Sequence, residues 1–249
     1  MQIVACYSNK GGVGKTATAV NLAYAFAASG RRTLLCDLDP QGASGFYFRV
    51  KPSTKLTKNR FFEDVERFTK AIRGSDYDNL DILPANMSFR DFDIFLSRMK
   101  NTRSRLKKAL KSVKSDYDTV LLDCPPNIST LSENVFRAAD AVVVPAIPTT
   151  LSQRTFEQLL AFFREHDLPV KRIHAFFSMV QGTKSLHGDV MEEMIQNHRK
   201  RIMAARIPFT SEIERMGVTR APVLATAPES PAGKAYQVLF NELLGRVGS

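Results

Sequence analysis

A glycine-rich segment near the amino terminus most limits what this 249-residue chain can fold into. Residues 8–19 read SNKGGVGKTATA; the apolar run QIVACYS leads into them, and KTATAVNLAYAFAASG continues with apolar residues at helical spacing as far as Gly30. An apolar run with β-branched residues predicts a buried strand. Glycines between a strand and a helix let the backbone curl and direct its N–H groups toward an anion. The segment therefore predicts a strand, a phosphate-binding loop and a helix, in that order.

The loop departs from the common pattern of phosphate-binding loops, G-x-x-x-x-G-K-[ST]. If Gly14, Lys15 and Thr16 fill the end of that pattern, its first glycine should stand at position 9, where the chain has Asn9 followed by a second lysine, Lys10. A lysine in the place of Lys15 reaches the β- and γ-phosphates of a nucleotide, and the hydroxyl after it binds Mg²⁺. Only one of the two lysines can fill that ordinary place.

Apolar runs and helical patterns alternate along the rest of the chain. The runs that predict strands are RTLLCDLD, NLDILPA, YDTVLLDCPP, ADAVVVPAIP and RIHAFFSMV. The helical patterns lie at residues 129–139, 151–165, 188–205 and 234–244. This alternation predicts an α/β fold with a mostly parallel β-sheet and helices on both faces. Because no repeat, low-complexity tract or linker interrupts the chain, we expect residues 1–249 to form a single domain.

Three aspartates stand at the ends of two predicted strands. Asp37 and Asp39 lie two residues apart in CDLDPQG, so both leave their strand on the same side, and Asp123 ends TVLLD. Ligands bind beyond the carboxyl ends of the strands in such sheets, and Mg²⁺ takes oxygen ligands. We expect Asp123 to serve a bound Mg²⁺, while Asp37 and Asp39 can both face the phosphates. For either of these two taken singly, the alternative is to cap the following turn.

The segments KGGVGKT, DLDPQG and LLDCPP, in this order and at these distances, resemble the nucleotide motifs of the ParA/MinD family of deviant Walker ATPases. The likeness continues through LDILPAN, AADAVVVP and AYQVLFNELL, so it covers nearly the whole chain. The resemblance implies a P-loop NTPase that hydrolyses ATP with Mg²⁺. It also implies a homodimer with ATP sandwiched between its subunits, which acts as a switch and whose hydrolysis a partner protein stimulates.

The resemblance assigns roles to single positions. Lys10 matches the signature lysine that reaches across the dimer to the partner's nucleotide, where a positive charge stabilises the charge that develops in phosphoryl transfer. Lys15 matches the P-loop lysine, and Asp39 matches the aspartate that positions the attacking water. These three residues are the implied catalytic set. The positions that match the surroundings of the magnesium ion are Thr16, Asp37 and Asp123.

The whole loop follows the family with one departure. Gly11 and Gly12 match positions where any side chain would obstruct the loop of the opposing subunit. The family loop usually continues Lys-Thr-Thr, whereas Ala17 holds the second hydroxyl position here, so we expect one hydrogen bond to the α-phosphate to be lost. The residues implied to bind the nucleotide are Lys10, Gly11, Gly12, Val13, Gly14, Lys15, Thr16 and Ala17.

The net charge and the carboxyl-terminal segment bear on the partner. The chain has 35 Lys and Arg against 25 Asp and Glu, a net charge of +10, which favours nucleic acid or an anionic membrane surface. Family members divide in this way: MinD-type proteins end in a basic membrane helix, whereas partition proteins bind DNA non-specifically as ATP dimers. The tail KAYQVLFNELLGRVGS has one lysine and one arginine. It predicts a core helix rather than a membrane-surface helix, with an apolar stripe of Tyr236, Leu239, Phe240, Leu243 and Leu244.

Basic clusters elsewhere are the candidates for contacts with DNA. They are NHRKRIMAARIP, ERMGVTR and the segment 98–114. Phosphate contacts by Lys and Arg give sequence-independent binding that weakens with salt. The alternative for each residue is a solvated helix face. By analogy with the carboxyl-terminal third of partition ATPases, the candidates are Arg199, Lys200, Arg201, Arg206, Arg215 and Arg220.

The cargo is indicated only by comparison within the family. No helix-turn-helix region precedes the loop, so we expect no separate DNA-binding domain. Residues 207–237 lack the R-N-V-R-L-S-E-A-P stretch of many partition members and look more like the small orphan members that position protein cargoes, such as carboxysomes or chemoreceptor clusters. Within that group we favour carboxysomes, with a small ParB-like or McdB-like adaptor that stimulates hydrolysis. Plasmid or chromosome partition, and a membrane-associated MinD-like regulator, remain alternatives.

Location and cysteine usage complete the expectations. The chain shows no signal-peptide pattern and no stretch of about 18 uncharged apolar residues, so we expect a cytoplasmic, nucleoid-associated protein without a membrane partner. Cys6, Cys36 and Cys124 each lie beside an apolar run, which predicts small buried thiols. A third class, a metal-cluster carrier resembling the nitrogenase iron protein, needs paired cysteines. Cys124 lacks a CxxC partner for such a cluster.

Overall fold

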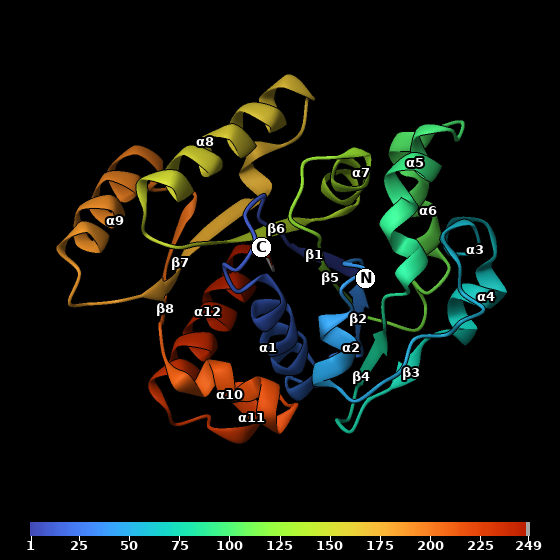
Figure 1. Cartoon of the computed structure of the whole chain (residues 1–249), viewed down its shortest axis with the longest axis horizontal. Coiled ribbons are helices and arrows are strands. Elements are labelled where there is room, and N and C mark those ends of the chain that lie inside the picture. Colours follow the sequence, from blue (N-terminus) through green and yellow to red (C-terminus); the bar gives the residue numbers. More distant parts are fainter. Residues whose placement is uncertain (248–249) are drawn as a thin grey trace.

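The computed structural model describes residues 1–247; residues 248 and 249, the last two of the predicted domain, lie outside the described part. Its centre is a single eight-stranded sheet (Figure 1). Across the sheet the order is β3-β4-β2-β5-β1-β6-β7-β8, and each neighbouring pair is parallel except β3 with β4. The strands are β1 Gln2–Cys6, β2 Thr33–Asp37, β3 Arg73–Gly74, β4 Leu80–Leu83, β5 Thr119–Asp123, β6 Ala141–Ala146, β7 Ile173–Val180 and β8 Ile202–Pro208.

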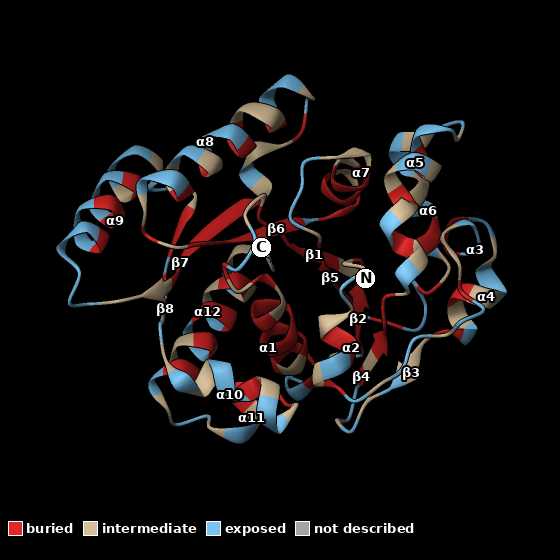
Figure 2. Cartoon of the chain, viewed as in Figure 1, coloured by how far each residue is buried: buried red, intermediate tan, exposed pale blue. Residues whose placement is uncertain are grey.

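Helices cover both faces of this sheet. One buried apolar cluster lies under α1, α10, α11 and α12, and a second lies under α3 to α9 on the other face. Figure 2 shows buried residues concentrated in the strands and on the inner sides of the helices. This arrangement confirms the predicted α/β fold. The helices are α1 Lys15–Ala28, α2 Ala43–Tyr47, α3 Lys58–Glu63, α4 Val65–Lys70, α5 Phe92–Ser97, α6 Arg105–Lys111, α7 Thr130–Ala138, α8 Thr150–Glu165, α9 Ser185–His198, α10 Ser211–Thr219, α11 Val223–Thr226 and α12 Pro231–Val247.

The strand order places the acidic strand ends beside one another. β1, β2 and β5 are neighbours at the centre of the sheet, and their parallel pairing aligns Asp37 with Asp123 and Cys6 with Asp123. The strand β1 ends at Cys6, and the glycine-rich loop begins just after Tyr7. The loop and both carboxylates therefore meet at the carboxyl edge of the sheet, where ligands bind in folds of this kind.

The last helix packs on the sheet, as its apolar stripe predicts. Tyr236, Leu239, Phe240 and Leu243 are buried, and the ring of Phe240 meets that of Phe26 in α1 edge to face at 5.1 Å between centroids. Burying this stripe leaves α12 no apolar face for a membrane surface. Within residues 1–247, no helix combines the length and the apolar character needed to cross a bilayer.

The helix predicted over residues 188–205 is wrong in its second half. The observed helix α9 ends at His198, and residues 202–208 form the edge strand β8. Along this strand Met203, Ala205 and Ile207 are buried, whereas Ala204 and Arg206 are exposed, which is the period of two of a strand. The turn at residues 199–201 separates two apolar patterns that a single helix cannot satisfy together.

Side chains of α12 cover the open edge of β8. The Glu242 carboxylate accepts hydrogen bonds from the backbone N–H groups of Ala204, at 2.8 Å, and Ala205, at 3.2 Å. Arg246 donates to the carbonyl of Ile202 at 3.0 Å and is paired with Glu242 at 2.8 Å. Unpaired backbone groups on an edge strand invite pairing with another chain. The side chains of Glu242 and Arg246 therefore satisfy several backbone groups of β8 that another chain could otherwise pair with.

Candidate nucleotide-binding site

The loop between β1 and α1 has the backbone that its glycines predict. Gly12 and Gly14 have φ angles of +69° and +90°, in the left-handed region where a side chain is strained. A Cβ atom at Gly14 would also lie 3.2 Å from the Ser178 hydroxyl. Helix α1 begins at Lys15 with no side-chain cap and no acidic residue in its first turn. Its first N–H groups therefore remain available for an anion.

The two lysines of the loop differ in their surroundings. Lys15 is buried and turns back into the loop, where its Nζ donates to the carbonyl of Lys10 at 3.2 Å. Burial lowers the pKa of Lys15, while the negative charges of Asp123 and Asp39 act against that change. Lys10 is partly exposed, and within residues 1–247 its side chain makes no hydrogen bond or ion pair. The structure thus directs Lys15 into its own loop and leaves Lys10 unengaged.

Asp37 and Asp123 form a buried carboxylate pair at adjacent strand ends. Both are fully buried. The Asp37 oxygens accept hydrogen bonds from the N–H groups of Asp39, at 3.0 Å, and Ser44, at 3.1 Å. Asp123 Oδ2 accepts a hydrogen bond from the Ser44 hydroxyl at 2.8 Å. Asp123 Oδ1 is buried without a hydrogen-bond partner in the described part of the chain, although the Thr16 hydroxyl lies near this carboxylate.

The electrostatics of this pair fit a divalent cation. Burial raises the pKa of Asp123 to about 6, against a partial opposite effect of the Ser44 and Thr16 hydroxyls. Burial, followed by the charge of Asp123, raises the pKa of Asp37 well above its usual value. Neither carboxylate has an ion-pair partner within 4.0 Å among residues 1–247. Buried carboxylates are costly unless they are paired or coordinate a metal, and Asp123 Oδ1 is a free oxygen ligand.

Asp39 lies in the turn that follows this pair. It is partly exposed, and its Oδ1 accepts the N–H of Gln41 at 3.0 Å. Its carbonyl accepts the N–H of Gly42, whose φ of +65° closes the turn. The turn holds Asp39 at the mouth of the site, whereas Asp37 lies within it. The spacing of two residues therefore separates an inner carboxylate from an outer one.

Ser44 was not identified from the sequence, yet it contacts both inner carboxylates. Its N–H and hydroxyl, at the start of α2, donate to Asp37 and Asp123 respectively. The other end of α2 is attached to α10, because Arg220 donates to the Phe46 carbonyl at 2.9 Å and places its guanidinium 4.7 Å from the centroid of the Phe46 ring. The only sequence signal for Ser44 is a hydroxyl two residues after the D-L-D-P-Q-G turn.

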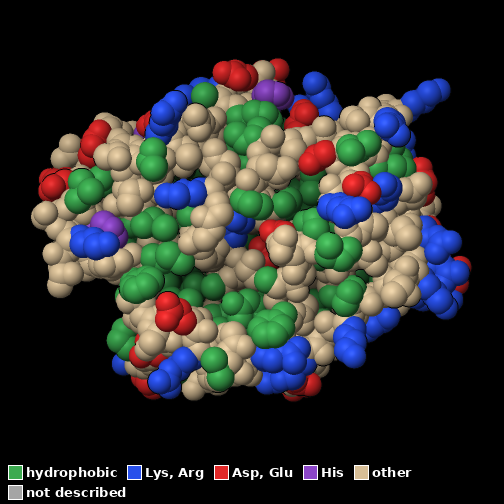
Figure 3. All heavy atoms as spheres, in the orientation of Figure 1, with side chains coloured by type: hydrophobic (Ala, Val, Ile, Leu, Met, Phe, Trp, Pro, Cys, Tyr) green, Lys and Arg blue, Asp and Glu red, His purple; other side chains and the backbone are tan. Residues whose placement is uncertain are grey.

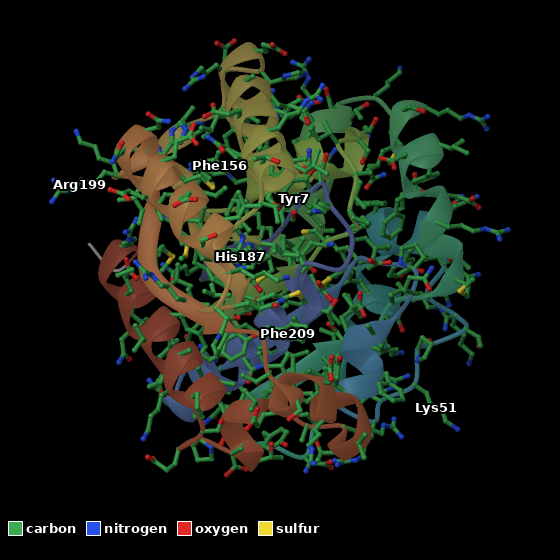
Figure 4. The ribbon with its side chains drawn as sticks, turned by 60° about the vertical axis from the view of Figure 1, so that its left-hand side comes forward. Tyr7, Lys51, Phe156, His187, Arg199 and Phe209 are labelled. Atoms are coloured by element: carbon green, nitrogen blue, oxygen red, sulfur yellow. The ribbon has the colours of Figure 1, made fainter. Side chains whose placement is uncertain are left out.

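The six candidate DNA contacts do not form one cluster. Arg199, Lys200 and Arg201 share the turn between α9 and β8 and line a surface hollow of about 350 Å³ together with Arg164. Figure 4 shows Arg199 at the surface of the molecule. The other three lie on β8 or around α10: Arg206 and Arg215 are exposed, whereas Arg220 is held against Phe46.

The cysteines behave as the sequence predicts. Cys6, Cys36 and Cys124 are free and buried, and burial raises the pKa of all three thiols well above the usual value.

No group of three or more His, Cys, Asp or Glu residues suited to hold a metal ion occurs within residues 1–247. Asp37 and Asp123 therefore stand as a pair, without a third ligand of these types beside them in the described part of the chain.

Comparison with known proteins agrees with this geometry. The family model described as AAA domain matches residues 1–172. The sporulation initiation inhibitor protein Soj of Bacillus subtilis is 30% identical over 97% of this chain and 98% of its own length. A cobyrinic acid a,c-diamide synthase from Mycobacterium smegmatis, solved with ADP and magnesium, is 27% identical, with a TM-score of 0.81 over 100% of this chain and 96% of that one.

A second structure extends the likeness of fold. An ATP complex of a variant of Cyanothece McdA has a TM-score of 0.83 over 100% of this chain and 96% of its own, at 17% identity. Other curated relatives at 29% and 28% identity are chromosome partitioning proteins named ParA. The loop, the aligned carboxylates and these likenesses agree, and the chain belongs to the AAA-domain P-loop ATPases of the ParA and Soj type.

Proposed function

We propose that this chain is an ATP-hydrolysing dimerisation switch with Mg²⁺ as its cofactor. Two copies enclose ATP, the dimer binds nucleoid DNA without regard to sequence, and hydrolysis separates the copies. In this way an intracellular cargo is positioned or partitioned in the cytoplasm. The observation that carries the proposal is the division of labour between the two loop lysines: Lys15 turns into its own loop, and the Lys10 side chain is unengaged.

Lys10 fits a role toward a second copy. Its neighbours Gly11 and Gly12 are exposed, and a Cβ atom at either would meet nothing within 4 Å inside the chain. This face of the loop is thus free to approach another molecule closely. A lysine supplied by the partner would stabilise charge on the γ-phosphate, as arginine fingers do in other ATPases. Hydrolysis would then require the dimer.

Apolar side chains beside the loop also fit a dimer. Ile128, Leu151, Leu186 and Phe209 are exposed and follow the carboxyl ends of β5, β6, β7 and β8. Figure 3 shows hydrophobic side chains gathered around a hollow at the centre of the molecule, and Phe209 is labelled in Figure 4. Exposed apolar residues grouped around a site mark an interaction surface. A second copy that covers the nucleotide would bury them.

The carboxylates and the loop divide the chemistry. Lys15 would move from the Lys10 carbonyl to the β- and γ-phosphates, while the loop N–H groups hold the phosphate oxygens. Thr16, Asp37 and Asp123 would surround Mg²⁺, which supplies positive charge to the phosphates when bound. Asp39, at the mouth of the site, would orient the attacking water.

DNA and a protein cargo are the partners that we favour. The basic turn at residues 199–201 and the exposed Arg206 and Arg215 supply cations for phosphate contacts. The favoured cargo is the carboxysome, through a small McdB-like or ParB-like adaptor that stimulates hydrolysis; plasmid or chromosome partition is the alternative. A membrane-associated MinD-like role is disfavoured because the apolar stripe of α12 is buried.

Light scattering after size exclusion tests the role of Lys10. With ATP and Mg²⁺ we expect a dimer for the wild type and a monomer for Lys10→Ala. Lys234→Ala is the matched control, because Lys234 is an exposed lysine at the start of α12. A Lys10→Ala dimer that forms as readily as the wild-type dimer would refute the role in trans.

Asp39→Ala tests the catalytic assignment, with DNA binding as a second measurement. We expect this variant to dimerise with ATP and to stay on duplex DNA, because the carboxylate that orients water is gone while the carboxylates expected around Mg²⁺ remain. Unchanged turnover would contradict the assignment. If the ATP-bound wild type sedimented with anionic liposomes and did not shift duplex DNA at low salt, the membrane-associated alternative would replace the proposal.

A further inference from the structure

Most of the surplus positive charge lies outside residues 199–220, which hold the six single residues proposed to contact DNA. Residues 49–114 carry 17 Lys and Arg against eight Asp and Glu, a net charge of +9 out of +10 for the chain. Residues 199–220 carry six Lys and Arg against two Glu, a net charge of +4. The first segment includes the strand pair β3–β4 at one edge of the sheet, and the second includes β8 at the opposite edge.

A hollow beside α4 collects part of this charge. Its volume is about 420 Å³, and Lys55, Arg67, Lys70 and Arg73 line it together with the hydroxyl-bearing Ser53 and Thr54. The residues that line the hollow include no carboxylate, and only Lys70 is paired with an acid, the exposed Glu66. Arg73 is held in place by hydrogen bonds to the carbonyls of Lys70, at 2.7 Å, and Ile72, at 3.0 Å.

Helix α6 extends the charge on the same side of the molecule. Leu106, Ala109 and Leu110 face the core, so the solvent face of the helix is left to lysines. Lys107, Lys108, Lys111 and the following Lys114 are exposed, and none has an ion-pair partner among residues 1–247. Between α4 and α6 lies a second hollow, which Arg105 and Lys108 line together with Glu63 and Asp64. Residues of α4 line this hollow as well as the first one, so the two basic groups lie on either side of α4.

The views agree on where this surface lies. Figure 3 shows Lys and Arg side chains gathered along the right-hand side, over the region that α4, β3 and α6 occupy in Figure 1. Figure 4 shows Lys51, which precedes the α4 hollow, and Arg199 on opposite sides of the molecule. The two basic surfaces are therefore separate.

We propose that the hollow beside α4 and the lysine face of α6, together called the basic shoulder, bind the phosphate backbone of duplex DNA. The inference rests on the proposed function only in taking DNA as the polyanion. Proteins hold phosphates with Lys and Arg side chains and with hydroxyls, and the α4 hollow offers both. The shoulder is a second contact surface, separate from the turn at residues 199–201.

Two other polyanions fit this surface less well. A membrane-bound helix needs an apolar face to insert between lipids, and the apolar residues of α6 are buried in the core. An acidic protein partner is usually anchored by aromatic or other large apolar side chains at the centre of the interface. No aromatic residue lines the α4 hollow, and the rings of Phe61, Phe62 and Phe68 beside the second hollow are buried. Phosphates spaced along a duplex need only cations and hydrogen-bond donors.

The position of the shoulder has a consequence for the nucleotide cycle. All its residues come from one chain. They lie beside β3, α4 and α6, at the lateral end of the sheet, and not at the ends of β1, β2 and β5, where ATP is proposed to bind. The shoulder should therefore bind DNA weakly in the absence of ATP, with strong dependence on salt. In the ATP dimer it should add to the contacts made by residues 199–220.

Fluorescence anisotropy with a labelled duplex of arbitrary sequence tests the shoulder, without nucleotide and with ATP and Mg²⁺. The variants are Lys55→Glu in the α4 hollow and Lys111→Glu on α6. Lys234→Glu is the matched control, since it changes the net charge equally at an exposed lysine of α12. We expect each shoulder variant to weaken binding at least about fivefold in both states and to lower the slope of log K against log salt by about 0.9. The control should stay within about twofold of the wild type.

The outcomes separate this inference from the proposed function. If both shoulder variants behave like Lys234→Glu in both states, the shoulder is not a DNA surface, and ATP-dependent binding by the wild type would still support the switch. If ATP adds nothing to binding while both variants lose affinity, the shoulder stands and the ATP-dependent switch fails. The last measurement uses vesicles of phosphatidylglycerol. If the wild type binds these vesicles but not the duplex at the same salt concentration, and both variants lose binding to the vesicles, DNA is not the partner. Circular dichroism of each variant verifies the fold.

Discussion

Replacing Asp123 with asparagine should stabilise the nucleotide-free protein at alkaline pH while removing a carboxylate from the proposed magnesium site. Asp123 is fully buried at the end of β5, and its Oδ1 has no hydrogen-bond partner within residues 1–247. Asparagine keeps the shape and can still accept the hydrogen bond of the Ser44 hydroxyl. The substitution therefore removes the buried charge with little change in packing.

The expected magnitude follows from the pKa of Asp123. Burial raises this pKa from 3.8 to about 6, which corresponds to about 3 kcal/mol of cost to the ionised form. The folded state thus binds more protons than the unfolded state between these two values, so stability falls as the pH rises through this window. Between pH 5 and pH 8 the cost grows by about 1 kcal/mol. A buried amide without an acceptor costs about 1–3 kcal/mol, but this cost does not depend on pH.

Urea unfolding in chelator and without nucleotide measures the effect. The quantity to compare is the difference in unfolding free energy between Asp123→Asn and the wild type at pH 8, minus the same difference at pH 5. We expect this quantity to be positive by about 1 kcal/mol. Asp78→Asn is the control, because it makes the same chemical change at an aspartate that is exposed to solvent. It should give a value near zero.

A value near zero for Asp123→Asn as well would refute the reasoning, because it would mean that the carboxylate is solvated or paired in the folded protein. A negative value would have the same meaning. Saturating Mg²⁺ with ATP should reverse the order of stability at pH 8, since the wild-type carboxylate then gains a ligand that asparagine holds less well.

Two further substitutions test the loop and the last helix. Gly14→Ala should cost about 1–3 kcal/mol of stability and reduce binding of a fluorescent ATP analogue. The reason is that Gly14 has a φ of +90° and an added Cβ would lie 3.2 Å from the Ser178 hydroxyl. Gly245→Ala, in open space on α12, is the control and should keep both its stability and its binding of the analogue. Phe240→Ala should cost about 3–5 kcal/mol in urea unfolding because its buried ring packs against Phe26. Val238→Ala, half-exposed on the same helix, is its control, and equal losses in the two variants would contradict the packing of α12.

The parts of this protein that local pattern determines were predictable. The strand, loop and helix at the amino terminus follow from a buried run, glycines that allow left-handed φ angles and apolar residues at helical spacing. The buried stripe of α12 follows for the same reason, as does the burial of the three cysteines within apolar runs. Each of these features depends on residues close together in the chain, so periodicity and backbone preference suffice.

Other features needed contacts between distant segments. A helical pattern through residues 188–205 fits the sequence, but pairing with β7 and cover from α12 make residues 202–208 a strand. Arg220 is one basic residue among many in the sequence, yet a contact with Phe46, far away in the chain, determines its position. Tertiary packing outweighs local preference in both places.

The site shows the same division. The sequence by itself determined which residues we expect to carry the chemistry: the loop lysines, Thr16 and the three strand-end aspartates. Only the tertiary structure decided that Asp37 lies beside Asp123, that Ser44 contacts both, and that Lys15 turns inward while Lys10 stays unengaged. The reason is physical: residue type and spacing act along the chain, whereas strand order and burial determine which distant groups meet and which charges lose their water.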